Sequence, residues 1–309
     1  MPTLLVTHPA CLDHLTPLGH PERPDRLRAI NEALAAPEFA ALTRAQAPSA
    51  PFETIALCHP MDYIEAIRAA TPQQGMARID ADTTLSPGSF EAALRATGGA
   101  LFAVDEVVSR RADNAFVAVR PPGHHAETAR AMGFCLFNSA AIAARYAQDH
   151  HGLTRAAVVD FDVHHGNGSQ DIFWSDESVM YCSTHEMPLY PGTGARDERG
   201  EHDNIVNAPL RSGDGGPKFR EAFETTILPR LKAFAPDIII VSAGFDAHAN
   251  DPLASLNFVE EDFGWATGKL MELADARAQG RVVSVLEGGY DLEGLSQSAA
   301  AHVTTLMRG

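Results

Sequence analysis

The sequence predicts an α/β fold in which helices cover both faces of a parallel sheet. Short apolar, β-branched runs, typical of buried parallel strands, occur at 115–120, 156–159, 237–242 and 281–286. Helical patterns lie among them, at roughly 89–109, 137–150, 218–234 and 260–279. Strands that alternate with helices indicate a parallel sheet, and residues 1–8 are expected to add a first strand.

Length and composition favour one cytoplasmic domain over residues 1–309. The 309 residues are 45% hydrophobic, which is enough for a large core, and they contain no repeat or long polar linker. No apolar stretch is long enough to span a membrane, and the first residues lack the features of a signal peptide. The scattered cysteines Cys11, Cys58, Cys135 and Cys182 are expected to be reduced core residues.

The charge balance is strongly acidic, with 24 basic and 40 acidic residues and a net charge of −16. This balance argues against direct nucleic-acid binding, because no basic stripe is available to neutralise phosphates. It would weakly favour the approach of cationic substrates, although solubility alone explains it equally well.

Each of the four apolar runs is followed by polar residues or glycines. The segments that follow are 121–125 (PPGHH), 160–168 (DFDVHHGNG), 243–246 (AGFD) and 287–290 (EGGY). Ligands of parallel sheets bind outside the carboxyl ends of the strands, so these segments are expected to converge in one crevice.

The 160–168 segment predicts a metal site. If the chain stays extended, Asp160, Asp162 and His164 project to one side. Two buried carboxylates without a cation are costly, which favours a metal over a plain hydrogen-bond network. Asp162, His164 and Asp246 would leave a coordination position open, as catalytic zinc sites do, and Fe²⁺ or Co²⁺ would suit the same ligands. Asp160 is a candidate for orienting a neighbouring histidine.

Beside a metal, His124 and His125 become candidates for acid–base chemistry. Asp160 and Asn167 offer them one charged and one neutral partner, which would separate their pKa values. Tyr290 follows two glycines that permit a tight turn, so its hydroxyl could donate to a developing oxyanion. A tyrosine that merely caps the core is the alternative.

Taken together, these residues resemble the histone deacetylase superfamily, in particular class II deacetylases, bacterial histone deacetylase-like amidohydrolases and acetylpolyamine amidohydrolases. The resemblance runs nearly end to end. The matching segments are 19–27, 120–127, 133–138, 160–168, 190–194, 242–246, 251–253 and 286–290. It implies an arginase/deacetylase fold with a mostly parallel sheet of about eight strands.

The resemblance also implies roles for individual residues. Zinc would be held by Asp162, His164 and Asp246, while His125 would act as general base and then acid. His124 would pair with Asp160 and Asn167 would orient His125. A structural K⁺ would be bound by Asp160, Ser183 and Thr184. The substrate tunnel would be lined by Gly133, Phe134, Tyr190 and Leu253. Arg26 would lie at the foot of the pocket.

The implied activity is hydrolysis of acetyl groups from acetylated amines, either acetyllysine in peptides and proteins or acetylpolyamines. Tyr290, where some class II members have histidine, favours true deacetylase activity. A binuclear ureohydrolase would need a carboxylate where Gly244 stands, and a noncatalytic acyl-lysine binder would not need the complete set of site residues. The loops 71–87 and 186–203 are expected to form the tunnel rim, which insertions or homo-oligomer formation shape in polyamine enzymes.

Overall fold

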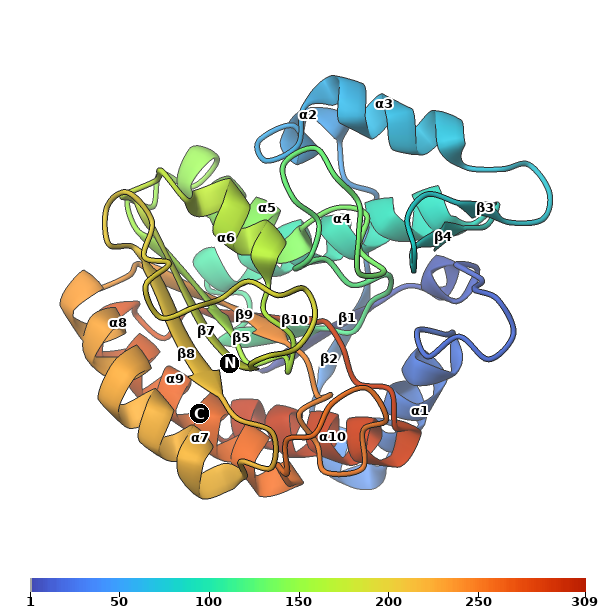
Figure 1. Ribbon diagram of the computed structural model, residues 1–309. Helices are drawn as coiled ribbons and strands as arrows, with labels where there is room; N and C mark the ends of the chain where they lie inside the picture. The colour runs from blue at the N-terminus through green and yellow to red at the C-terminus, as the bar shows by residue number, and fades with distance from the viewer. Residues whose placement is uncertain (1) are drawn as a thin grey trace.

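The computed structural model describes residues 2–309, and an eight-stranded sheet forms its centre (Figure 1). The strands of this sheet are β1 (Leu4–Thr7), β2 (Thr43–Gln46), β5 (Asn114–Val117), β6 (Ala156–Asp160), β7 (Val179–Glu186), β8 (Ile205–Leu210), β9 (Ile238–Ala243) and β10 (Val282–Leu286). Their order is β2-β1-β5-β10-β9-β6-β7-β8, and every neighbouring pair is parallel. The expected sheet of about eight strands is therefore confirmed, and it is wholly parallel.

Helices pack against both faces of the sheet. On one side lie α4 (Ser89–Val108) and α5 (Ser139–Asp149), and on the other α9 (Glu260–Arg277) and α10 (Leu292–Arg308) (Figure 1). The shorter helices are α1 (Asp25–Ala33), α2 (Phe52–Ile55), α3 (Met61–Ala70), α6 (Asn167–Phe173), α7 (Gly216–Ala222) and α8 (Leu228–Phe234). Because both faces are covered, the strands carry continuous apolar runs rather than alternating ones.

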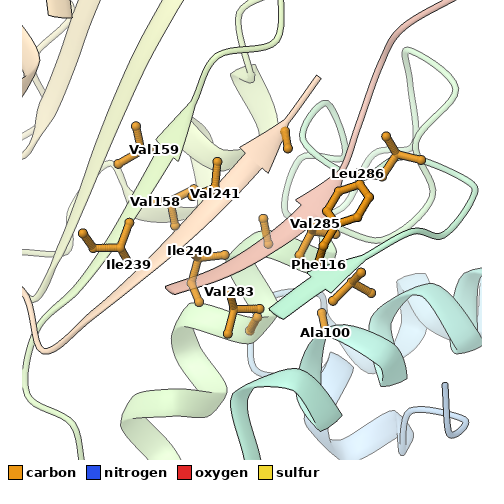
Figure 2. Packing of buried hydrophobic residues seen from close by; sticks show 14 of the residues in the cluster. Ala100, Phe116, Val158, Val159, Ile239, Ile240, Val241, Val283, Val285 and Leu286 are labelled. Carbon is orange, nitrogen blue, oxygen red and sulfur yellow. The ribbon is translucent and has the colours of Figure 1, made fainter. Parts of the chain in front are cut away.

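The core lies where the central strands meet these helices (Figure 2). Val158, Ile240 and Val283 lie side by side on adjacent strands, and all three are fully buried. Burial of each such side chain contributes roughly 1.5–3 kcal/mol. These contacts keep the central strands in register, and the register positions the loops that follow them.

The four strands followed by the predicted polar segments are neighbours in the sheet. In the order β5-β10-β9-β6 they occupy its middle, so their carboxyl ends open onto the same crevice. The predicted convergence follows from this arrangement.

Several elements were not expected from the sequence. They include β2, the hairpin of β3 (Ala77–Arg78) and β4 (Thr84–Leu85), the strands β7 and β8 at one side of the sheet, and helices α1, α2, α3, α6 and α10. Short 3₁₀ turns cover Pro9–Leu12 and Pro37–Phe39. The helix expected over 218–234 is interrupted by a π-helical turn at Phe223–Ile227, just before Pro229, which has no amide hydrogen to donate.

All four cysteines are buried, in agreement with their expected place in the core, and within residues 2–309 none of them is in a disulfide. Within residues 2–309, none of the helices is long and apolar enough to cross a membrane.

A buried carboxylate joins the N-terminal segment to the sheet. Glu22 accepts hydrogen bonds from Arg26 at 3.1 Å and from Arg120, and all three side chains are fully buried. Its burial opposes ionisation, but Arg120 and His14 outweigh that effect and hold the pKa of Glu22 well below its usual range. Arg120 ends the segment after β5, so this ion pair anchors the loop that carries the two histidines.

Glu22→Gln is expected to lower the free energy of unfolding by about 3–5 kcal/mol, because it leaves two buried guanidinium groups without a carboxylate. Urea unfolding at pH 7 would measure this loss. The wild type should also lose stability as the pH falls below about 4.5, while the variant should lack this contribution. Glu221→Gln, which breaks the exposed Lys218–Glu221 pair, is the control and should change little. Equal stability of the Glu22 variant and the wild type would contradict the prediction.

Candidate metal centre and active site

The three predicted metal ligands come together below the crevice. Asp162 and His164 follow β6, and Asp246 follows β9. One ligand atom from each lies within 4.8 Å of the others, and all three residues are buried. His164 Nδ1 lies 3.2 Å from Asp162 Oδ1 and 3.1 Å from Asp246 Oδ2. The 160–168 segment therefore supplies two candidate ligands, and the loop after the neighbouring strand β9 supplies the third.

The charges of this group favour a bound cation. Burial, and then the charge of Asp162, raises the pKa of Asp246 to about 7. Burial would lower the pKa of His164, yet its hydrogen bonds to Asp162 and Asp246 raise it to about 10. A buried pair of carboxylates thus attracts positive charge to the nitrogen between them. Two oxygen ligands and one imidazole fit Zn²⁺, and they also fit Fe²⁺ or Co²⁺.

Glycines leave the space that the carboxylates occupy. A Cβ added to Gly244 would collide with the Asp162 carboxylate, and one added to Gly288 would collide with Asp246 and Asp162. A further carboxylate at position 244 would therefore have no room beside Asp162. This crowding fits one metal ion rather than two.

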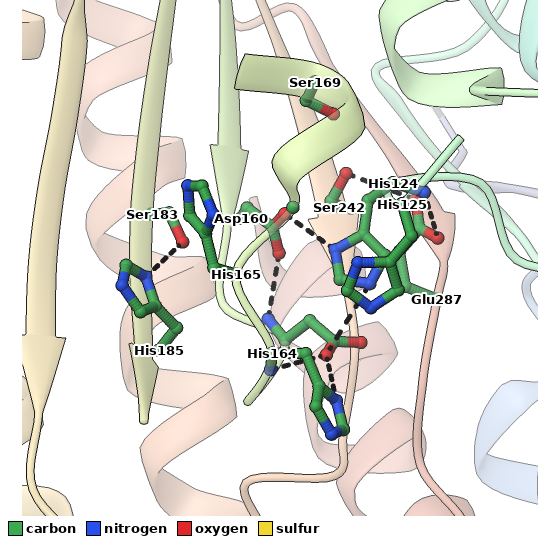
Figure 3. Close-up of polar contacts among 12 residues, drawn as sticks. His124, His125, Asp160, His164, His165, Ser169, Ser183, His185, Ser242 and Glu287 are labelled. Carbon is green, nitrogen blue, oxygen red and sulfur yellow. Dashed lines mark hydrogen bonds and ion pairs between the residues drawn. The ribbon is translucent and has the colours of Figure 1, made fainter. Parts of the chain in front are cut away.

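Asp160 lies beside this group rather than in it. The chain leaves the strand after Asp160 and bends, so the expectation of an extended chain through His164 was wrong. The bend is held by Asp160 Oδ1, which accepts the Asp162 amide at 3.1 Å. Asp160 Oδ2 is 3.0 Å from His124 Nδ1 (Figure 3). The same oxygen accepts the Tyr181 hydroxyl at 3.0 Å. Asp160 thus orients His124.

The two adjacent histidines have different partners. His124 contacts Asp160, whereas His125 Nδ1 lies 2.8 Å from Asn167 Oδ1. Burial would lower the pKa of His124, but the charges of Asp162 and Asp160 hold it well above its usual range. Burial, and then the charge of His124, keeps the pKa of His125 well below its usual range. The pKa values of the two adjacent imidazoles are therefore shifted in opposite directions, upward for His124 and downward for His125.

Two further residues support the histidines and were given no role from the sequence. Glu287 accepts the amides of His124 at 3.1 Å (Figure 3) and of Gly123 at 2.6 Å. The Tyr181 hydroxyl accepts the Gly166 amide at 3.0 Å. Burial raises the pKa of Glu287 to about 7. Glu287 begins the predicted EGGY segment, which was its only signal, and Tyr181 belongs to a strand that was not predicted.

Tyr290 lies at the wall of the same crevice. Its amide donates to Asp251 Oδ2 at 2.7 Å, and Asp251 Oδ1 accepts the Leu253 amide at 3.0 Å. Asp251 thereby fixes both residues. Burial raises the pKa of Tyr290 well above its usual range, so the phenol stays protonated and can donate a hydrogen bond.

A cavity of about 220 Å³ leads from the surface to these groups. It is lined by Asp82, His125, Gly133, Phe134, His164, Leu189, Tyr190, Leu253 and Tyr290. All four predicted tunnel residues are therefore placed along it. Asp82 and Leu189, which the sequence did not single out, come from the two loops expected to form the rim.

Arg26 lies behind Tyr290, with its guanidinium carbon 4.9 Å from the ring centroid. It donates to the carbonyls of Gly289 and Glu287 and to the Glu22 carboxylate. These bonds commit Arg26 to holding the turn that carries Tyr290, and it does not line the cavity.

Ser183 pairs with Asp160 in the register of β7 and β6, and its hydroxyl lies 2.8 Å from His185 Nδ1 (Figure 3). The neighbouring Thr184 hydroxyl is buried and has no hydrogen-bond partner among residues 2–309. The three residues predicted to bind K⁺ are thus close together on two adjacent strands.

Fold and site together define a hydrolase of the arginase/deacetylase fold. The family model for the histone deacetylase domain matches residues 20–306, which is most of the chain. This chain therefore belongs to the histone deacetylase family of amidohydrolases.

Individual relatives agree with this assignment. The histone deacetylase-like amidohydrolase of Pseudomonas aeruginosa is 38% identical over 278 residues, covering 88% of this chain and 73% of that protein. An uncharacterised protein of Synechocystis is 43% identical, and 96% of each chain is covered. The crystal structure of the HDA15 HD domain matches with a TM-score of 0.94 at 36% identity, covering 99% of this chain and 88% of that one.

Proposed function

We propose that this protein is a zinc-dependent deacetylase that hydrolyses the acetamide of acetyllysine in peptides or proteins. The observation that carries the proposal is the grouping of Asp162, His164 and Asp246 next to a cavity that His164 and His125 line. The relatives named deacetylases and amidohydrolases support the same reaction class.

The residues around the cavity suit amide hydrolysis. A divalent metal held by Asp162, His164 and Asp246 would supply Lewis-acid polarisation and acidify a water. His125 Nε2 would accept the proton of the attacking water and later protonate the leaving amine. Tyr290 would donate its phenolic hydrogen to the developing oxyanion, and cationic His124 would stabilise the same negative charge.

The small volume and the apolar walls of the cavity suit an aliphatic stem that carries the acetamide. Its volume of about 220 Å³ lies below the roughly 300–1,000 Å³ of most small-molecule pockets. Phe134, Tyr190 and Leu253 give it largely apolar walls. Asp82 is the one carboxylate among the residues that line it, whereas nearby Asp80 is within 3.5 Å of Arg130. A cavity lined by one carboxylate favours acetyllysine over a polyamine with several ammonium groups.

A substrate panel tests the proposal. Acetate release would be measured from acetyllysine peptides, acetylputrescine and acetylspermidine with the zinc-loaded protein. Higher kcat/KM for the peptides supports the proposal, and higher values for the polyamines would favour an acetylpolyamine deacetylase. Acetate release from none of them would support a noncatalytic acyl-lysine binder.

Metal removal is expected to abolish acetate release, because the buried carboxylates alone cannot polarise the amide. Dialysis against a chelator, followed by titration with Zn²⁺, should restore activity at about one metal ion per chain. Metal analysis and activity would be measured on the same samples. A requirement for about two ions would instead favour the binuclear ureohydrolase.

Three further features belong to the same proposal. K⁺ would bind between β6 and β7 at Asp160, Ser183 and Thr184. The protein would act without direct contact to nucleic acid or membrane, and light scattering would test whether it forms a homo-oligomer. A cytoplasmic location stays a prediction, and two plant relatives are named chloroplastic.

A further inference from the structure

Asn167 contacts a carboxylate as well as the predicted base. Its side-chain nitrogen Nδ2 donates to Glu127 Oε1 at 2.7 Å, while its oxygen Oδ1 faces His125 Nδ1 at 2.8 Å. Glu127 is two residues beyond His125, and its side chain borders a small surface hollow that Asn167 also lines. The sequence had suggested no role for it.

The position of Glu127 is fixed by the turn that contains it. The Glu127 amide donates to the Arg130 carbonyl at 3.0 Å, which closes a turn over 127–130. Thr128 donates its amide and its hydroxyl to Asp171 Oδ2 at 2.9 and 2.7 Å. Asp171 lies one turn after Asn167 on α6, so the helix holds this turn through both donors of Thr128.

Helix α6 is itself attached to the histidine loop. The amides of Gly168 and Ser169, in its first turn, donate to the His124 carbonyl at 3.0 and 3.2 Å. Asn167 therefore lies between two parts of one connected segment, with His125 on one side and Glu127 on the other.

The donor and acceptor properties of these groups determine how the amide is turned. An ionised carboxylate only accepts hydrogen bonds, so Asn167 must point its NH₂ group at Glu127. Its oxygen then faces His125, and only a protonated Nδ1 can donate to that oxygen. With the proton on Nδ1, Nε2 of the neutral imidazole is left with a free lone pair.

We propose that Glu127 is a positioning residue that fixes the Asn167 amide and so keeps His125 in the tautomer that can act as a base. The proposal rests on the proposed function, because it assigns His125 the role of general base. Without Glu127, the Asn167 amide is free to rotate by half a turn and present its NH₂ group to His125.

The same geometry explains why an amide suits position 167. An aspartate there would place its carboxylate against that of Glu127, at a spacing of about one hydrogen bond, so Asn167→Asp is expected to impair catalysis. Adding Glu127→Gln should restore part of the activity. The introduced glutamine would donate its NH₂ group to the introduced carboxylate, whose second oxygen would accept the Nδ1 proton of His125.

The kinetic test compares Glu127→Ala, Asn167→Asp and the Asn167→Asp/Glu127→Gln double variant, all zinc-loaded. Glu127→Ala should lower kcat about tenfold with little change in KM, a part of the roughly 10²–10⁴-fold that a general base contributes. The double variant should be more active than Asn167→Asp alone. Glu106→Ala is the matched control, since it removes a partly buried glutamate that pairs with Arg111. Glu106 is near the end of α4 and shortly before β5, so it lies toward the amino end of the strands, away from the crevice.

A second measurement needs no substrate. In protein labelled with ¹⁵N-histidine, the His125 signals, assigned by their loss in His125→Ala, should report an unprotonated Nε2 in the wild type and mixed tautomers in Glu127→Ala. Unchanged tautomers in Glu127→Ala would overturn the proposal whatever its kcat, as would a double variant no more active than Asn167→Asp. If the wild type released no acetate, the proposed function would fail, and the tautomer measurement would still decide the role of Glu127.

Discussion

Replacement of His125 by alanine is expected to lower kcat for acetyllysine hydrolysis by about 10²–10⁴-fold, the usual contribution of a general acid–base group. The reason is geometric, because His125 lines the cavity beside His164 and its Nδ1 is already bonded to Asn167. His124 cannot replace it, since Asp162 and Asp160 hold that imidazole as a cation. Steady-state assays with an acetyllysine peptide would measure the loss.

The pH profile adds a second check on the same residue. A base must be unprotonated, so wild-type kcat/KM should rise with pH through the pKa of His125. Burial lowers that pKa well below its usual value, which places the rise below pH 6.5. His125→Ala should lose this acid limb. His151→Ala, which removes a histidine that pairs with Asp105 outside the cavity, serves as the control. Wild-type kcat in His125→Ala would exclude His125 as the base.

The parts of the fold that could be predicted are those with strong local patterns. β6, β9 and β10 are buried on both faces, and their continuous apolar runs mark them clearly. The edge strand β2 has an exposed, polar sequence, Thr43–Gln46, and gives no such signal. Among the short helices before residue 85, α1 packs against α10, and Tyr63 of α3 contacts Phe137. Periodicity within one segment cannot reveal such contacts with distant segments.

The same distinction applies to the site. Metal-ligand candidates such as Asp162 and Asp246 could be found because each follows a recognisable strand. Glu127 and Asp82 bond to partners that are 40 and 51 residues away, Asn167 and Gly133, so these contacts depend on tertiary placement. The bend after Asp160 was also missed, since it depends on a hydrogen bond between a side chain and a nearby amide. The candidate reacting groups could therefore be predicted from sequence more readily than the side chains that contact them.

Tyr290→Phe is expected to lower kcat by about 10²–10³-fold, the usual cost of one oxyanion donor. The phenylalanine would keep the ring contacts with Phe134 and Arg26, so the turn after β10 should stay in place. Only the hydroxyl is lost. Because Tyr290 stays protonated in its buried position, its contribution is a donated hydrogen bond rather than a charge. Steady-state kinetics with an acetyllysine peptide would measure kcat and KM.

The expected separation of kcat from KM distinguishes this role from substrate binding. A donor that acts on the oxyanion stabilises the transition state more than the ground state, so KM should change less than kcat. Tyr146→Phe is the matched control, since its hydroxyl bonds Asp105 outside the cavity. Metal content and thermal stability of Tyr290→Phe should equal those of the wild type, because the substitution keeps the ring that packs in the wall. An unchanged kcat would remove Tyr290 from the mechanism and leave cationic His124 as the protein's remaining stabiliser of the oxyanion.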